Sequence, residues 1–324
     1  MRHLLYIVPT LIALWLIDNA LSEDRYAGWE RNSVRNSMRR WAERPKAKVA
    51  IFGSSTSKDW LSADLAARVT GVRRGDVLDA HINGCHQGCT WASVQKLRQR
   101  GYHFEVAFFG TNLFQLCEED HSKRVLQHQM MTPALDAPAL FGLYLHARQP
   151  LRPMARYLGM TLSGAYADTA VLQHGAARRL FGEPVPGKAY RWYRDDAPAA
   201  SEVLSCRYED DDIAYKHAIS EALLDDLQGL ADHVFLMMLP DRSVGLDEPE
   251  HGARWQKHLA LHRAMADARP HVTLIDLVHD GVRDERMFRD GFHLNRQGMA
   301  IQQRLFTRRM KDAGWPRPAE AKTK

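Results

Sequence analysis

Cysteine is scarce in this chain, with four residues among 324, and no two of them form a Cys-x-x-Cys pair. A small disulfide scaffold needs far more cysteine for its length, and a thiolate zinc site needs more ligands at close spacing. Cys85 and Cys89 lie four positions apart, whereas Cys117 and Cys206 stand alone. Four cysteines allow three disulfide pairings, and the spacing does not choose among them.

Charge of one sign is not concentrated in this sequence either. The chain has 44 Lys and Arg against 39 Asp and Glu, a net charge of +5, and both signs are spread along it. A nucleic-acid-binding domain usually gathers its positive charge on one stripe or tail, so no nucleic-acid partner is expected. The acidic run at residues 209–212 lacks the spaced ligands and glycine of a calcium loop, and is interpreted as a solvated surface.

Long apolar runs are limited to residues 4–17. Arg2 precedes this run, Asp18 follows it, and Ala20-Leu21-Ser22 offers small residues at a possible cleavage site. This layout predicts a signal peptide or a single-span signal anchor over residues 1–22, with the rest of the chain periplasmic or otherwise extracytoplasmic, and either membrane-anchored or secreted. The alternative is a buried core helix, because apolar runs of this length also occur in protein cores.

Five short, nearly continuous apolar runs alternate with segments of helical periodicity, which predicts an α/β fold with a parallel sheet covered on both faces. The expected strands are residues 48–53, 77–82, 104–109, 234–239 and 272–277, and the expected helices include 62–69, 91–98, 254–268 and 296–310. The main domain is placed at 47–315, after a lead-in helix or stalk at 23–46 and before a tail at 316–324. About 120 residues without a convincing strand predict a helical insertion at about 118–230, since a structureless loop of that size is improbable.

Candidate catalytic residues follow the ends of the expected strands. Gly53-Ser54-Ser55 follows the first strand, Gly84 the second and Asn112 the third, while Asp290-x-x-His293 precedes the last helix. Each motif alone is compatible with an ordinary turn or helix cap. Together they fall in order at the edge where parallel α/β sheets bind ligands.

These residue types suit acyl transfer through a serine. A serine becomes a nucleophile when a base takes its proton and a third group orients that base. Asp290 and His293 are spaced so that both side chains can turn the same way from one loop. The oxyanion needs N–H donors, which the backbone of Ser55, the backbone of Gly84 and the side-chain amide of Asn112 would supply.

At these residues the sequence resembles the SGNH (GDSL-like) hydrolase superfamily, whose four blocks carry Ser, Gly, Asn and His, the last within an Asp-x-x-His motif. The resemblance spans roughly residues 47–312, with Ser54 in place of the usual Asp of the first block. It implies Ser55 as nucleophile, His293 as general base and then acid, and Asp290 as its orienting group. It also implies a three-layer α/β/α fold with strand order 2-1-3-4-5 and no metal or organic cofactor.

The resulting hypothesis is an extracytoplasmic serine esterase or O-acyltransferase that acts through an acyl-enzyme on acyl esters of a glycan or cell-envelope molecule. Gly-Ser-Ser together with an N-terminal anchor resembles the membrane-anchored envelope branch of the superfamily. Expected partners are the acyl-ester or glycan substrate, a membrane reached by one span, and envelope biosynthesis proteins. The alternatives are a lipase-like carboxylesterase, and a glycan-binding or assembly protein that retains the fold without turnover.

Overall fold

The computed structural model of the chain describes residues 37–38, 40–112, 115, 210–240, 249–279, 281–282, 284–289 and 293–316, with isolated positions 9, 10, 12, 13, 16, 142 and 145. The chain divides into two compact units, one made of residues 1–36 and 119–192 and the other of residues 37–118 and 193–324. Every helix and strand discussed below belongs to the second unit. Most of the expected signal segment, lead-in, insertion and tail lies outside the described residues. Among the helices that are described, none is long and apolar enough to cross a membrane.

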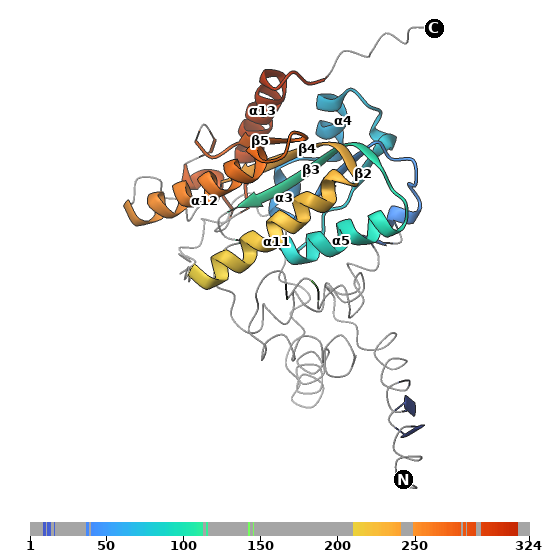
Figure 1. Cartoon of the computed structure of the whole chain (residues 1–324). Coiled ribbons are helices and arrows are strands. Elements are labelled where there is room, and N and C mark those ends of the chain that lie inside the picture. Colours follow the sequence, from blue (N-terminus) through green and yellow to red (C-terminus); the bar gives the residue numbers. More distant parts are fainter. Residues whose placement is uncertain are drawn as a thin grey trace, which may run out of the picture. The chain divides into compact units, whose positions relative to one another are not determined.

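A five-stranded parallel sheet forms the centre of the second unit (Figure 1). Its order is β2-β1-β3-β4-β5, which confirms the expected topology. The strands are β1 Val49–Phe52, β2 Val77–Asp79, β3 Phe104–Asn112, β4 Ala231–Leu239 and β5 Val272–Asp276. Nearly every side chain of β1, β3 and β4 is buried, because both faces of a parallel sheet are covered.

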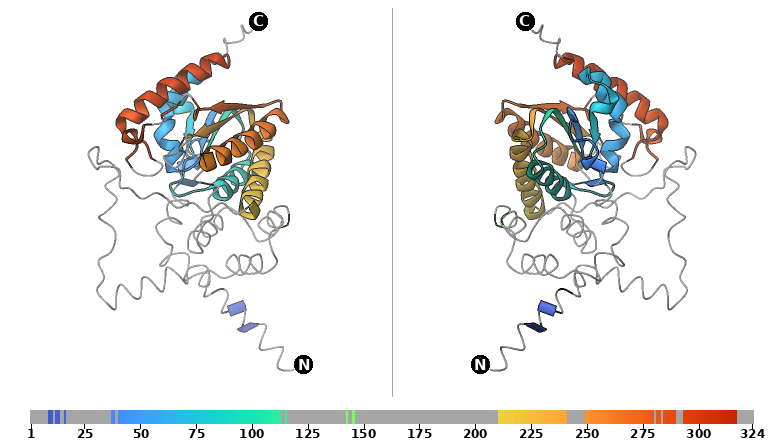
Figure 2. Two further views of the ribbon diagram at one scale, coloured as in Figure 1. Left: turned by 90° about the vertical axis from the view of Figure 1, so that its left-hand side faces the viewer. Right: turned by 90° about the vertical axis from the view of Figure 1, so that its right-hand side faces the viewer.

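Helices cover both faces of this sheet, which confirms the three-layer α/β/α architecture (Figure 2). One layer contains α3 Ser55–Trp60, α4 Ala63–Thr70 and α13 Arg296–Asp312; the other contains α5 Gln87–Gln99, α11 Asp210–Gln228 and α12 Pro249–Asp267. Two short 3-10 helices, η1 Arg74–Asp76 and η3 Glu285–Met287, precede β2 and α13. On the first face, Phe108 stacks on Phe235 and meets the ring of Phe306 edge-on.

The helix α11 lies inside the range 118–230 that the sequence predicts as an insertion, and it packs against α5 and β4. Its position follows from topology, because two adjacent parallel strands cannot be joined by a tight turn and need a crossover that usually contains a helix. It precedes β4 and returns the chain to the edge where that strand begins. All five strands therefore point their carboxyl ends toward one edge, where the loops that carry the candidate site lie.

Candidate active site

The turn after β1 presents Ser55 as the first residue of α3. Gly53 has a φ of +141°, and a Cβ at that position would lie 2.2 Å from the Oγ of Ser57, so only glycine allows the helix to begin so close to the strand. The hydroxyl of Ser57 donates to the carbonyl of Gly110 at 3.1 Å and ties α3 to the end of β3. As the first residue of a helix, Ser55 also has a backbone N–H without a partner inside that helix.

His293 reaches this serine from the opposite end of the sequence. Its Nε2 lies 2.8 Å from the Oγ of Ser55, although the two residues are 238 positions apart. The imidazole is buried, whereas Ser55 is half-buried between buried neighbours. The hydroxyl of Ser54 instead faces Thr56 at 2.7 Å. Of the two serines that follow Gly53, Ser55 is the one whose Oγ contacts the imidazole.

The loop that carries His293 is held in place on both sides. Phe288 and Leu294 form an antiparallel bridge, and the N–H of Arg289 donates to the carbonyl of His293 at 2.9 Å. The guanidinium of Arg289 also donates to both carboxylate oxygens of Asp59, at 3.0 and 3.2 Å. Only 13% and 10% of these two side chains is exposed, so the pair is shielded from water. Because Asp59 belongs to α3, this ion pair joins the helix that begins at Ser55 to the loop that carries His293, called the histidine loop below.

Asp290 lies outside the described residues. It falls between Arg289 and His293, both of which the structure describes. Its expected role, which is to orient His293 in the tautomer that accepts a proton from serine, stays a prediction.

The turn after β2 carries Gly84 to the same edge. The N–H of Ile82 donates to the carbonyl of Gly53 at 3.1 Å, and the N–H of Cys85 closes the turn on the carbonyl of Ile82 at 3.1 Å. Gly84 has a φ of +73°, a backbone conformation that residues with a side chain rarely adopt, which explains the glycine.

A disulfide between Cys85 and Cys89 fastens this turn to the first turn of α5. This bond belongs to one of the three pairings that four cysteines allow. The other two cysteines lie outside the described residues.

Asn112 ends β3 with its side chain fully buried. Its Oδ1 accepts a hydrogen bond from the N–H of Gln115 at 3.3 Å, while its Nδ2 finds no partner among the described residues. Leaving such a donor buried and unpaired costs about 1–3 kcal/mol. An unpaired amide donor at the carboxyl edge of the sheet can become satisfied when an oxyanion binds there.

A chain of buried hydrogen bonds behind the serine was not predicted from the sequence. Gln87 donates to Thr111, Thr111 donates to the amide oxygen of Gln115, and the amide nitrogen of Gln115 donates to Ser54. Ser54 then bonds Thr56. The chain connects the ends of three neighbouring strands. The signal that could have suggested it is the pair of glutamines, each located three residues beyond a candidate oxyanion donor.

A hydrogen-bonded pair of side chains, Asp79 and the buried His81, supports the start of the loop that carries Gly84. The Oδ1 of Asp79 lies 2.9 Å from the Nδ1 of His81 and also accepts from the backbone N–H of His81. Burial by itself would raise the pKa of Asp79, but the hydrogen bonds and charge of His81 outweigh it and hold that pKa well below its usual value. Asp79 is therefore ionised at neutral pH, and it anchors the chain just before the glycine turn.

The chain matches no protein-family model, and a search of curated proteins finds none that is similar to it. The features of the chain that bear on its function are the positions of Ser55, His293, Gly84 and Asn112 at one edge of the sheet. Ser55 and His293 are in direct contact. Asn112 ends β3 and Gly84 lies in the loop after β2, and these two strands flank β1.

Proposed function

We propose that the chain is a serine esterase or O-acyltransferase of the SGNH type, which acts outside the cytoplasm on acyl esters of a glycan or other cell-envelope molecule. The observation that carries this proposal is the 2.8 Å contact between the Nε2 of His293 and the Oγ of Ser55. A serine and an imidazole in hydrogen-bond contact at the carboxyl edge of a parallel sheet match the nucleophile and base of covalent acyl transfer.

In the first step the Oγ of Ser55 attacks the ester carbonyl while the Nε2 of His293 takes its proton. The carbonyl π electrons move to oxygen, and the resulting oxyanion accepts hydrogen bonds from the N–H of Ser55, the N–H of Gly84 and the Nδ2 of Asn112. Collapse of this intermediate breaks the bond to the leaving alcohol, which takes the proton from His293. The acyl group then remains on Ser55 as an ester.

In the second step an acceptor hydroxyl attacks the acyl-enzyme and His293 takes the proton of that hydroxyl. The new tetrahedral intermediate collapses, the Oγ of Ser55 leaves, and His293 returns the proton to it. The acceptor decides the net reaction: water gives hydrolysis, and a sugar hydroxyl gives transfer. Both outcomes use the same residues.

The extracytoplasmic location draws support from the disulfide between Cys85 and Cys89. Disulfides persist in oxidising compartments and are rare in the reducing cytosol. The expected signal segment at residues 1–22 is the sequence feature that would deliver the chain there. A reporter that is active only outside the cytoplasm, fused after Lys324, should be active; recovery of an inactive fusion in the cytosol would contradict this location.

The proposal is tested by labelling the full chain with a fluorophosphonate probe and mapping the modified peptide by mass spectrometry. The serine Oγ displaces fluoride from the probe and forms a stable phosphonate ester, so only an activated serine reacts quickly. Wild type and Ser54→Ala should be labelled on Ser55, whereas Ser55→Ala and His293→Ala should not. Labelling of Ser54 in the Ser55→Ala variant, or of no serine in folded wild type, would contradict the assignment.

A panel of acyl donors separates this function from a lipase-like carboxylesterase. Short-chain acetyl esters of oligosaccharides should be consumed faster than long-chain lipid esters, with acyl transfer to added glycan detected by mass spectrometry. A preference for long acyl chains would favour the lipase-like alternative. Binding of glycan without any acyl release would favour the non-catalytic one.

A further inference from the structure

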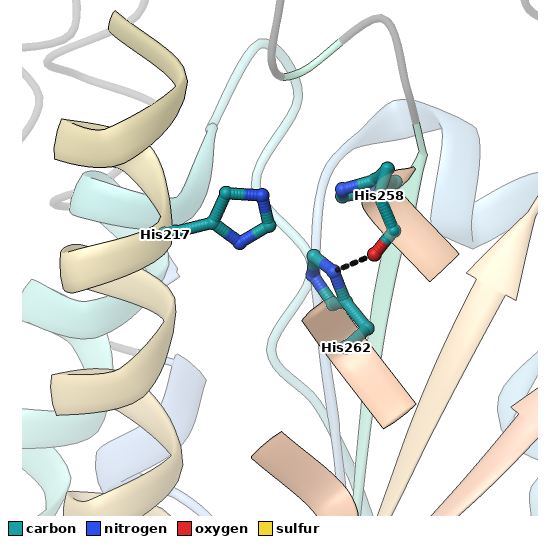
Figure 3. A group of neighbouring side chains, drawn as sticks. All are labelled: His217, His258 and His262. Atoms are coloured by element: carbon teal, nitrogen blue, oxygen red, sulfur yellow. Dashed lines mark hydrogen bonds between the residues drawn. The ribbon is translucent and has the colours of Figure 1, made fainter. Parts of the chain in front are cut away.

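Three histidines meet between α11 and α12, two helices that carry neither Ser55 nor His293. His217 belongs to α11, while His258 and His262 lie one turn apart on the same face of α12 (Figure 3). All three side chains are buried. One ring nitrogen of each lies within 4.8 Å of the corresponding nitrogens of the other two. We call these residues the histidine cluster.

The ring nitrogens of the histidine cluster are almost entirely unpaired. Both nitrogens of His217, both of His258 and the Nε2 of His262 have no hydrogen-bond partner among the described residues. Buried polar atoms in folded proteins are nearly always paired, so five unpaired nitrogens in one small volume call for a ligand. The ligand that satisfies several imidazole lone pairs at once is a metal ion.

Among the described residues, the ring nitrogens of the histidine cluster make one hydrogen bond, and it arranges His262 as a ligand. Its Nδ1 lies 3.0 Å from the backbone carbonyl of His258, drawn as the dashed line in Figure 3. Because a carbonyl can only accept, the Nδ1 carries the proton and the lone pair of the neutral ring is on the Nε2. Metal-bound histidines commonly donate their second N–H to a carbonyl in this way, which sets the tautomer and the ring orientation.

The protonation state of the histidine cluster is compatible with metal binding. Burial lowers the pKa of His217 to about 4 and that of His262 to about 3, and it holds the pKa of His258 well below its ordinary value. The rings are therefore neutral at pH 7, which is the form that coordinates metal. The described residues add no fourth His, Cys, Asp or Glu to the group. Three imidazoles would leave one tetrahedral position for a water molecule.

We propose that His217, His258 and His262 bind a divalent transition-metal ion, with Zn²⁺ as the preferred occupant. Zinc accepts three histidines and a water in tetrahedral geometry, at Zn–N distances of about 2.0–2.1 Å. The three ligand nitrogens, which lie within 4.8 Å of one another, would move closer together around the bound ion. Mg²⁺ and Ca²⁺ are not expected to bind, because they prefer oxygen ligands.

The bound ion would join two crossover helices. The helix α11 precedes β4 in the sequence and α12 follows it, so coordination from both would link the two helices that flank this strand along the chain. The ion would play no part in the proposed acyl transfer, because none of the three histidines belongs to the candidate active site. Its role would be structural, within the layer formed by α5, α11 and α12.

The first test uses the full wild-type chain without a histidine tag, stripped with a chelator and titrated with zinc. One zinc ion per chain should bind at micromolar free zinc, and Co²⁺ should give the visible absorption of a tetrahedral site. X-ray absorption at the zinc edge should show about three imidazole nitrogens near 2.0 Å. No binding at micromolar zinc, or a sulfur atom in the coordination shell, would overturn the proposal. This test needs no variant to fold.

The second test compares His217→Gln and His262→Gln with His233→Gln, a matched control for loss of a buried histidine outside the cluster. His233 lies on β4 and its Nε2 is 3.0 Å from the Oγ1 of Thr273. Among variants that circular dichroism shows to be folded, the two cluster substitutions should weaken zinc binding by about 100-fold or more. The control should bind zinc like wild type. Unchanged affinity in both cluster variants would overturn the assignment.

Discussion

The candidate active site and the histidine cluster both depend on imidazole, yet their surroundings are opposite. At the edge of the sheet, His293 contacts a hydroxyl, and that hydroxyl belongs to a half-buried serine. In the histidine cluster, three rings face one another inside a helix layer, and five of their six nitrogens have no partner among the described residues. The serine of the first site is partly exposed, whereas all three rings of the second are buried.

The contrast follows from where the two sites lie in the fold, one in loops at the ends of strands and the other between packed helices. Loops at the carboxyl ends of parallel strands converge at one edge and leave a surface open to ligands. Helix faces that pack against one another exclude water, so a polar group there needs a partner within the protein or a bound ion. Each site can therefore be disrupted without the other.

Replacing Ser55 with alanine should have the largest effect. Loss of the nucleophile should reduce turnover of p-nitrophenyl acetate by about 10⁴-fold or more, because no acyl-enzyme can form. Zinc binding by the histidine cluster should be unchanged. Ser54→Ala serves as the control and should retain most of the turnover. Activity that survives in Ser55→Ala but disappears in Ser54→Ala would show that the other serine attacks.

Replacing Asn112 with alanine should lower turnover by about 100–1000-fold, or about 3–4 kcal/mol of transition-state stabilisation, with little change in Tm. The reason is that its Nδ2 donor acts only when charge develops on the oxyanion. Ser62→Ala is a control that should lower Tm and leave turnover unchanged. The hydroxyl of Ser62 caps α4 by accepting from the N–H of Leu65 at 3.2 Å. That control should lose about 1 kcal/mol of stability with normal turnover. A lowered Tm with near-normal turnover in Asn112→Ala would remove this residue from the site.

Saturation of the histidine cluster with zinc should stabilise the fold and leave turnover per folded molecule unchanged. At free zinc 100-fold above Kd the gain is about 2.7 kcal/mol, which corresponds to a rise in Tm of roughly 5–10 °C. Thermal melts of stripped and zinc-loaded protein measure this gain, and His262→Gln should abolish it. A rise in Tm of equal size in that variant would place the ion elsewhere.

Replacing Asp59 with asparagine should have the smallest of the four effects, a loss of about 2 kcal/mol of stability, because the shielded guanidinium of Arg289 would lose its bonds to the carboxylate of Asp59. Turnover should fall by about tenfold as the histidine loop shifts, while zinc affinity should stay the same. The double variant Asp59→Leu with Arg289→Met should recover much of the stability but not the turnover. Denaturant unfolding and initial rates measure the two quantities. Full turnover in Asp59→Asn would mean that the ion pair does not position His293.

Much of the fold could be predicted because the spacing of apolar residues along the chain indicates which side chains are buried. The expected strand at residues 234–239 corresponds to β4 Ala231–Leu239, and the expected helix at 296–310 corresponds to α13 Arg296–Asp312. The short helix α3 was not predicted, since residues 55–60 are mostly polar and their burial comes from packing against the sheet. The first turn of α5 was missed for the same reason.

The candidate site could be predicted in part because strand ends in a parallel sheet share one edge. That rule predicts that Ser55, Gly84 and Asn112 lie close together at the ends of neighbouring strands. It could not supply the hydrogen-bonded chain through Gln87 and Gln115, because those side chains meet only once three strands are aligned. Nor could it supply the ion pair between α3 and the histidine loop, whose partners are 230 residues apart.

The sequence by itself determined the class of fold and the order of the reactive residues, because both depend on local patterns of apolar and polar side chains. Only the tertiary structure decided which serine contacts His293, and that His217 meets His258 and His262. The pair at positions 258 and 262 has the spacing of one helical turn and is visible in the sequence, but its third member lies 41 residues earlier on a separate helix. Contacts of this kind depend on how helices pack across a sheet, and packing distances are not encoded in any short stretch of residues.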